Sequence, residues 1–395
     1  MWPLPGDPVF GPDKVAERPK LIYSDAIKQW VLWWHSDDAS YGSLTQSVAL
    51  SPSITGPFVH NATYKPFGSD SQDLGLFQDD DGTAYTLYST GDKTRDNKIT
   101  KLFPNLTTPE EETYTFNDFD LEAPMIVRTP ESYYIVMSHK TGYRPNNVVA
   151  FRSRSLTGPW SQPIPITALG TRTFSSQSLL NIPVKGSKTT TYIYVGDSWS
   201  GTGDELGESR YIWLPGLIDE EKGLFTINWQ DVWAINIKTG QWKAAAKSQQ
   251  KVYEAEDGFV VGDAWKQECA VCSGNQIVTG ISGSNNTLTI RDIRGTGEPQ
   301  WVSFWYINID DMGYGDQPGG SPDRIGNPFK LRRIASVSVN GEEPVELRMR
   351  DSNKGVLLST PLKITFSKGT ANYLIIGGFN GDKAADLDKI IVYDL

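Results

Sequence analysis

Histidine and cysteine are scarce in this sequence, which has three histidines and two cysteines among its 395 residues. The HExxH zinc motif, the GxSxG nucleophile motif and the phosphate-binding P-loop are all missing from it. Cys269 and Cys272 form a single CxxC, which supplies too few ligands for structural zinc, and no βαβ pattern surrounds it. We therefore expect a local disulfide there, and we expect carboxylates to carry any acid–base chemistry.

Long apolar runs are also missing: no stretch reaches the roughly 18 residues that a membrane-spanning helix needs, and residues 1–20 lack the apolar core of a signal peptide. The net charge of -10 and the pI near 5.0 disfavour a nucleic-acid partner. Three glycosylation sequons, at Asn61, Asn105 and Asn285, indicate a secreted, extracellular glycoprotein. An acidic chain with 13 Trp and 17 Tyr suits a neutral carbohydrate partner.

One pattern recurs through residues 1–242: a short apolar strand, a polar turn and then an alternating aromatic strand. Its copies cover 20–36, 74–90, 123–139 and 178–197, with a degenerate fifth copy at 223–242. The copies start roughly 50 residues apart, a spacing that fits the four-stranded blades of a β-propeller. We therefore predict an all-β propeller for this part of the chain.

A short polar stretch at 243–251 interrupts the repeats, and we interpret it as a linker. Residues 252–395 contain short alternating strands such as "WVSFWYINI" and "SVSVNG". This pattern predicts a β-sandwich of the jelly-roll kind, whose first and last strands lie close together.

Four polar side chains stand where the first strands of successive propeller repeats begin. A propeller places these strands around its central channel, so residues at their starts are the candidates for chemistry. They are Glu17, Asp73, Glu122 and Gln177. Because all four can bind a sugar and recur at one place in four repeats, we predict a shared pocket. Glu122 stands between apolar neighbours, which would keep its carboxyl protonated near neutral or mildly acidic pH, as a general acid requires.

Several short motifs resemble glycoside hydrolase family 43, and most closely its fungal exo-β-1,3-galactanase branch. They are Glu17-Arg18-Pro19-Lys20, Asp73-Leu74, Glu122-Ala123-Pro124, Thr141-Gly142, Ser176-Gln177-Ser178 and "GDSWSGTGDELGESRYIWLPG" at 196–216. The resemblance implies a five-bladed propeller that inverts configuration and releases galactose from the β-1,3-galactan backbone of arabinogalactans, without a cofactor for catalysis. It also implies that Tyr41 and Thr141 contact the galactose.

The resemblance assigns roles to the four pocket residues. Glu122 would be the general acid, and Asp73 would tune its pKa and hold substrate. The branch lacks the usual family aspartate base, and its glutamine, matching Gln177, would orient the attacking water. An amide has negligible basicity, so Glu17 is the chemically plainer group for that water. We assign water orientation to Gln177 and the binding of sugar and water to Glu17.

One departure from the family concerns the N-terminus, because this chain has only 16 residues before Glu17. Family members carry a further first-blade segment there, so we expect an incomplete first blade with an exposed edge strand and lower activity. Two alternatives stay open at this point. One is a non-catalytic galactan-binding protein; the other is a family 43 arabinofuranosidase or xylosidase. We expect a monomer in each case.

The C-terminal part resembles carbohydrate-binding module family 35, from "YEAED" at 253–257 through "DLDKIIVYDL" at 386–395. Glu254 and Glu256 alternate, which predicts that both lie on one face of the first strand. With Asp388 near the last strand they would supply the hard oxygen ligands that a structural Ca²⁺ prefers. Asp386 matches a sugar-binding aspartate of that module.

Overall fold

The computed structural model describes residues 11, 14–91, 93–142, 146–199, 207, 209–308, 332–353 and 355–395. Its regular structure is almost entirely β, as predicted. Apart from single turns of 3-10 helix, the helical structure in these ranges is α1 (Arg172–Ser175). Within the same ranges no helix has the length and apolar character that crossing a membrane demands.

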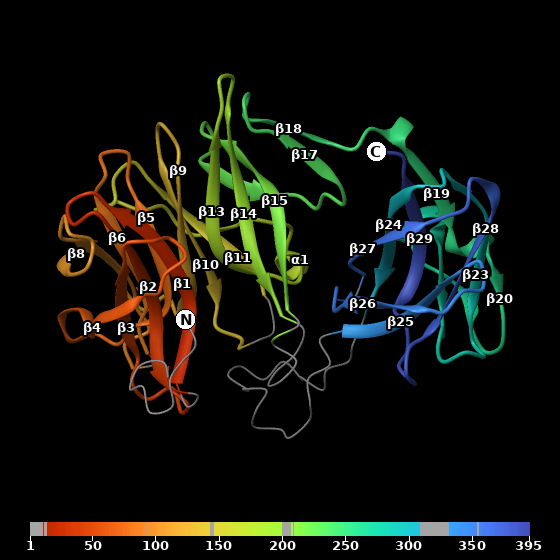
Figure 1. The fold of residues 1–395 in the computed structure, drawn as a ribbon, viewed down its shortest axis with the longest axis horizontal. Coiled ribbons are helices and arrows are strands. Elements are labelled where there is room, and N and C mark those ends of the chain that lie inside the picture. The colour runs from red at the N-terminus through yellow and green to blue at the C-terminus, as the bar shows by residue number, and fades with distance from the viewer. Residues whose placement is uncertain are drawn as a thin grey trace.

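Four antiparallel sheets of four strands follow one another along the chain, and each keeps its strands in chain order (Figure 1). The first holds β1 (Lys14–Ser24), β2 (Gln29–Asp38), β3 (Thr45–Ser51) and β4 (Val59–Tyr64), and the second holds β5 (Gln72–Gln78), β6 (Ala84–Ser89), β7 (Asn97–Leu102) and β8 (Pro109–Phe116). The third holds β9 (Leu121–Arg128), β10 (Tyr133–His139), β11 (Val148–Ser153) and β12 (Ile164–Pro165), and the fourth holds β13 (Gln177–Lys185), β14 (Thr190–Ser198), β15 (Arg210–Asp219) and β16 (Leu224–Ile227). Such sheets fit the blades of a propeller.

Local sequence accounts for the tight hairpins in these sheets. Between β5 and β6 the Asp81-Gly82 pair turns the chain, with Gly82 at φ 88, a left-handed conformation that glycine adopts without strain. The Gly82 amide donates to the Asp79 carbonyl at 3.0 Å and closes the turn. The second strand of the third sheet, β10, is almost fully buried, since Tyr134 to Ser138 are all buried.

The first strand of each sheet lies at the centre of this arrangement. β1 contacts β5, β5 contacts β9, and β9 contacts β13. The Arg18 guanidinium on β1 donates to the Ser178 carbonyl on β13 at 3.0 Å, which links the first and fourth sheets directly. The starts of these inner strands therefore meet around one space, which is where the sequence predicted the pocket.

A fifth, smaller sheet differs from the sequence interpretation. β17 (Trp233–Asn236) and β18 (Gln241–Ala244) form a two-stranded sheet, whereas residues 224–227 of the degenerate fifth repeat complete the fourth sheet as β16. The reason is the tight turn between β15 and β16, where the Lys222 amide donates to the Asp219 carboxylate at 3.0 Å and returns the chain onto β15. The first sheet has four strands, so the incomplete sheet is the fifth: four full sheets and one two-stranded sheet stand where five blades were predicted.

The C-terminal part contains two sheets. One has the order β21-β22-β29-β24-β27, with β19 also paired to β29; the other has the order β20-β23-β28-β25-β26. Their strands are β19 (Gln250–Glu254), β20 (Phe259–Val260), β21 (Trp265–Glu268), β22 (Gln276–Thr279), β23 (Leu288–Gly295), β24 (Pro299–Ile307), β25 (Arg332–Val339), β26 (Val345–Arg350), β27 (Leu358–Thr365), β28 (Gly369–Gly378) and β29 (Asp386–Tyr393). Both sheets contribute to one core, for example Phe304 from the first and Ile376 from the second. The first strand, β19, pairs with the last, β29, as predicted.

The connection between the two parts is short. β18 ends at Ala244 and β19 begins at Gln250, with the 3-10 turn η3 (Lys247–Gln249) between them, so the segment predicted as a linker is partly strand. The two parts also touch directly. Arg172 forms an ion pair with Asp351, and Arg350 donates to the Ser198 hydroxyl at 3.0 Å.

Candidate active site

The inner strand of each four-stranded sheet carries a bulge at the same position. In the first sheet Glu17 pairs with His35 and Lys20 with Trp33, so three residue steps on β1 face two on β2. The other three sheets repeat this offset. A bulge bends the strand and re-aims its side chains, and it recurs beside active sites. The last paired residues before the bulges in the first three sheets are Glu17, Gln72 and Glu122, and in the fourth sheet Gln177 lies one residue before the last paired residue, Ser178. Glu17, Gln72, Glu122 and Gln177 all line one pocket of about 860 Å³.

The structure therefore brings the sequence-predicted pocket together, with one correction. Asp73 is not the counterpart of Glu17 and Glu122; Gln72 is, and Asp73 lies one residue later, inside the bulge. Asp73 adopts a left-handed backbone with φ 50, as Arg18 does in the first sheet with φ 51. Strict alternation does not predict this step, because a bulge adds one residue to the inner strand.

A chain of hydrogen bonds crosses the pocket from Asp73 to Glu122. The Arg18 guanidinium donates to Asp73 Oδ1 at 2.8 Å and also to the side-chain oxygen of Gln177. The Gln177 amide nitrogen donates to Glu122 Oε1 at 2.7 Å and to the Ser138 hydroxyl at 2.8 Å. Both amide hydrogens of Gln177 are thus used, and its oxygen keeps one lone pair for a further donor such as water.

The pKa values of Glu122 and Asp73, the two carboxyls at the ends of these hydrogen bonds, are shifted in opposite directions. Burial raises the pKa of Glu122 well above its ordinary value, and the negative charge of Asp73 adds to that, against the weaker opposing effect of Arg18. Burial also acts to raise the pKa of Asp73, but the charges of Arg18 and His35 and the bond from Arg18 outweigh it and lower that pKa. A neutral acid beside an ionised carboxylate is the arrangement that acid catalysis requires.

Glu17 lies on another wall of the pocket, held by two partners. The Tyr41 hydroxyl donates to one of its oxygens, and His35 Nδ1 lies 3.1 Å from the other. His35 Nε2 lies 2.9 Å from Asp37 Oδ2, and Asp37 in turn accepts the Ser43 amide at 2.7 Å. Burial acts to lower the pKa of His35, but the bonds to the two carboxylates, Glu17 first, raise it overall. A buried imidazole between carboxylates therefore fixes the position of Glu17.

The other predicted sugar contacts lie at the pocket or beside it. Tyr41 lines the pocket. Thr141 is exposed, its hydroxyl accepts from Asn146 Nδ2 at 2.7 Å, and its neighbour Gly142 is part of the pocket lining. Within the quoted motif at 196–216, residues 200–206 and 208 lie outside the described residues.

Sequence reasoning missed several charged groups that the fold gathers here. Arg18 and Lys20 belong to the Glu17-Arg18-Pro19-Lys20 motif, and Asp197 is the second residue of the motif at 196–216, but none of the three was assigned a role. Asp197 Oδ2 lies 3.6 Å from Arg18 Nη2, and burial raises the pKa of Asp197. Burial, with the charge of Arg18, lowers the pKa of Lys20 to about 7. The signal for His35 was its rarity, since it is one of three histidines in the chain.

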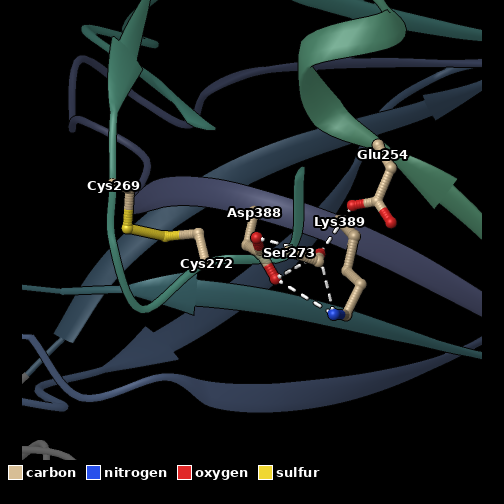
Figure 2. The surroundings of a disulfide bond; sticks show 6 residues. All are labelled: Glu254, Cys269, Cys272, Ser273, Asp388 and Lys389. Atoms are coloured by element: carbon tan, nitrogen blue, oxygen red, sulfur yellow. Dashed lines mark hydrogen bonds and ion pairs between the residues drawn. A yellow bond between two sulfur atoms is a disulfide. The ribbon is translucent and has the colours of Figure 1, made fainter. Parts of the chain in front are cut away.

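A second polar cluster lies in the C-terminal part, next to the predicted disulfide, which is present between Cys269 and Cys272 (Figure 2). The Ser273 hydroxyl lies 2.6 Å from Glu254 Oε2 and 3.1 Å from Asp388 Oδ1. Lys389 Nζ lies 2.8 Å from that hydroxyl and 3.3 Å from Asp388 Oδ2. Carboxylates of the first and last strands therefore meet around Ser273.

The predicted placement of Glu254 and Glu256 on one strand face was wrong. β19 ends at Glu254, and Glu256 belongs to the 3-10 turn η4 (Ala255–Asp257), because the chain turns there. Burial raises the pKa of Glu256, and the charges of Glu254 and Asp388 add to the effect. Asp386 does not share the hydrogen bonds around Ser273; it accepts one from Thr279 Oγ1 at 2.6 Å. As the described side chains stand, no three His, Cys, Asp or Glu residues are grouped closely enough to hold a metal ion.

The fold and the pocket together define a glycoside hydrolase: sheets that fit propeller blades, with two carboxyls at their centre whose pKa values are shifted apart, that of Glu122 raised and that of Asp73 lowered. Residues 19–179 match the model of glycosyl hydrolases family 43. The crystal structure of an exo-β-1,3-galactanase from Phanerochaete chrysosporium with β-1,3-galactotriose is similar at 34% identity and a TM-score of 0.83, over 97% of this chain and 83% of that one. This chain belongs to glycosyl hydrolase family 43.

More distant structures agree on the fold. A putative exo-β-1,3-galactanase from Bifidobacterium bifidum s17 is 26% identical with a TM-score of 0.54, over 60% of this chain and 78% of that one. An exo-β-1,3-galactanase from Clostridium thermocellum is 18% identical with a TM-score of 0.57, over 96% of this chain and 84% of that one, a likeness of fold alone. No curated protein matches the sequence.

Proposed function

We propose that this chain is an exo-acting glycoside hydrolase that releases galactose from β-1,3-galactan with inversion of configuration. The observation that carries the proposal is the hydrogen-bonded chain from Asp73 through Arg18 and Gln177 to Glu122, in which burial and a neighbouring anion favour a protonated Glu122. Supporting it is the similarity to a galactanase whose crystal structure holds β-1,3-galactotriose.

In this mechanism Glu122 gives its proton to the glycosidic oxygen as the bond between that oxygen and the anomeric carbon breaks. Water attacks the anomeric carbon from the opposite face, and in inverting enzymes the acid and the group that activates this water are roughly 6.5–9.5 Å apart, which leaves room for the water. The Gln177 nitrogen lies 2.7 Å from Glu122, so the nitrogen serves the acid, and the free lone pair of the Gln177 oxygen is left for the water. Glu17 binds sugar and water, and its carboxylate is the plainer acceptor for the water's proton.

The test is to incubate the purified chain with β-1,3-galactan and, separately, with aryl arabinoside and aryl xyloside, and to identify the products. We expect galactose alone, with the α anomer appearing first because the β linkage is inverted. Release of arabinose or xylose without galactose would reassign the sugar. Binding of galactan without any product would favour the alternative of a non-catalytic galactan-binding protein. The structural reason to consider that alternative is that the fifth sheet has only two strands among the described residues.

For the C-terminal part we propose a β-sandwich carbohydrate-binding module that holds a structural Ca²⁺ through Glu254, Glu256 and Asp388. The donor set suits calcium, which prefers carboxylate oxygens. Glu256 Oε2 is buried and has no hydrogen-bond partner among the described atoms, as a ligand atom awaiting a cation would. Lys389 Nζ, 3.3 Å from Asp388 Oδ2, would give up its place to the ion. Asp386 is the proposed sugar contact of the module.

A further inference from the structure

A groove between the two parts of the molecule continues from the active-site pocket. It is a cavity of about 590 Å³, lined on the propeller side by β15 and the segment from Trp229 to Trp233, and on the other side by β24, β26 and β27. Tyr211 and Trp213 of β15 line both this cavity and the active-site pocket. The two spaces therefore meet at β15, and we call the second one the interdomain groove.

The shared wall is built by alternation along β15. Tyr211 and Trp213 are 60% and 49% exposed, whereas Ile212 and Leu214 between and after them are buried in the core. Tyr211 pairs across the sheet with Asp197, which belongs to the active-site pocket. Two neighbouring aromatic side chains left in solvent on one strand face are unfavourable in themselves, and such surfaces mark ligand-binding sites.

The opposite wall adds a further aromatic ring, that of Trp301, together with charged groups. Trp301 on β24 is 41% exposed, and Lys363 lies over its ring, 5.8 Å from the centroid. Arg348 and Glu346 of β26 form an ion pair in the same lining. Aromatic faces with a few polar groups suit a neutral sugar chain, because a pyranose ring packs its C–H face on an aromatic ring while its hydroxyls need hydrogen-bond partners.

The two walls are held together by one half-buried carboxylate, that of Asp231. Asp231, which follows the fourth sheet, accepts from Trp305 Nε1 at 2.8 Å and from the Tyr393 hydroxyl at 2.9 Å, both in the C-terminal part. It also accepts from Trp229 Nε1 at 2.9 Å on its own side. Since these bonds cross between the two parts, the groove is formed before any ligand arrives, which reduces the entropy lost on binding.

We propose that the interdomain groove binds the part of the galactan chain that continues beyond the bond being cleaved. This inference rests on the proposed function. With the terminal galactose in the pocket beside Glu122, the remaining chain must leave through the pocket wall, and Tyr211 and Trp213 lead from that wall into the groove. The occupant is thus a run of neutral β-linked sugars, passing over β15 toward Trp301.

The test compares the dependence of kcat/KM on substrate length in the full chain carrying Trp301→Ala with that of the unmodified protein. The substrates are a β-1,3-linked galactose disaccharide and long β-1,3-galactan. We expect kcat/KM on long galactan to fall about tenfold, the effect of losing one aromatic anchor, and kcat/KM on the disaccharide to change less than about twofold, since Trp301 does not line the active-site pocket. Trp301→Phe should recover most of the loss.

Trp265→Ala is the matched control, since Trp265 is 53% exposed on β21 and lies outside both cavities. A second readout, independent of turnover, is calorimetric binding of the same two ligands to Glu122→Gln with and without Trp301→Ala. If Trp301→Ala behaves like Trp265→Ala at both lengths while galactose is released normally, the groove proposal is overturned and the proposed function stands. If the unmodified protein neither cleaves nor binds either ligand, the proposed function itself fails.

Discussion

Replacing Glu122 with glutamine removes the proton that the leaving oxygen must receive, and it keeps the shape of the side chain. The Gln177 nitrogen, 2.7 Å from Glu122 Oε1, can donate to the new amide oxygen as it does to the carboxyl. The new amide nitrogen can donate toward Asp73, whose charge raises the pKa of Glu122 in the native protein. We therefore expect Glu122→Gln to fold normally and to fail in chemistry.

The size of that failure follows from the role. General acid catalysis contributes typically 10²–10⁴-fold, so kcat on unactivated galactan should fall by about that factor, or about 3–5 kcal/mol of barrier. An aryl galactoside with a good leaving group needs little proton assistance and should lose far less. The assay is galactose release from both substrates under saturating conditions. Glu131→Gln is the matched control, because Glu131 is exposed in the hairpin that joins β9 to β10.

The same substitution should change how stability depends on pH. Burial, with the charge of Asp73, raises the pKa of Glu122 in the folded chain, so the folded state holds this proton more tightly than the unfolded chain does. The resulting contribution to stability is present below the ordinary glutamate pKa and is lost as pH rises through the raised pKa. Glu122→Gln should therefore lose less stability than the native chain on going to alkaline pH, as melting temperature against pH would record.

Two results would refute the reasoning on Glu122. The first is retention of more than a tenth of native activity on galactan, which would remove Glu122 from the role of acid. The second is an equal loss on galactan and on the activated aryl galactoside together with a lowered melting temperature, which would mean that the variant is misfolded.

Three further predictions concern other residues. Gln177→Ala should reduce galactose release at least about 10²-fold, the lower end of the range for a positioned catalytic group. If this variant turns over normally, the role of orienting the water belongs to Glu17 instead. Asp73→Asn removes a charge that raises the pKa of Glu122, so the alkaline limb of the kcat–pH profile should move to lower pH; an unmoved limb would contradict this. Calcium at a hundredfold excess over Kd should stabilise the fold by about 2.7 kcal/mol, as melting with and without chelator would measure; Glu256→Ala should abolish the response, and an indifferent native chain would leave an acidic cluster without an ion.

The sequence by itself determined the features that depend on near neighbours along the chain. Alternating strands and turn residues such as Asp81-Gly82 predicted the all-β class and the spacing of the four-stranded sheets, because side-chain period and turn conformation are local properties. The pairing of Cys269 with Cys272 was predictable for the same reason, with two residues between them. The identity of Glu122 and Gln177 as pocket residues also came from the repeat.

Only the tertiary structure decided the rest. The bulges on the inner strands put Gln72, and not Asp73, at the position in its strand that Glu17 and Glu122 occupy in theirs, since a bulge breaks the alternation on which the sequence interpretation relied. Arg18 reaches Asp73 and Gln177 from another sheet, contacts that no local pattern encodes. The raised pKa of Glu122 and the interdomain groove exist because distant segments exclude water from a carboxyl and enclose a space. Desolvation and shape belong to the packed molecule, not to any single stretch of its sequence.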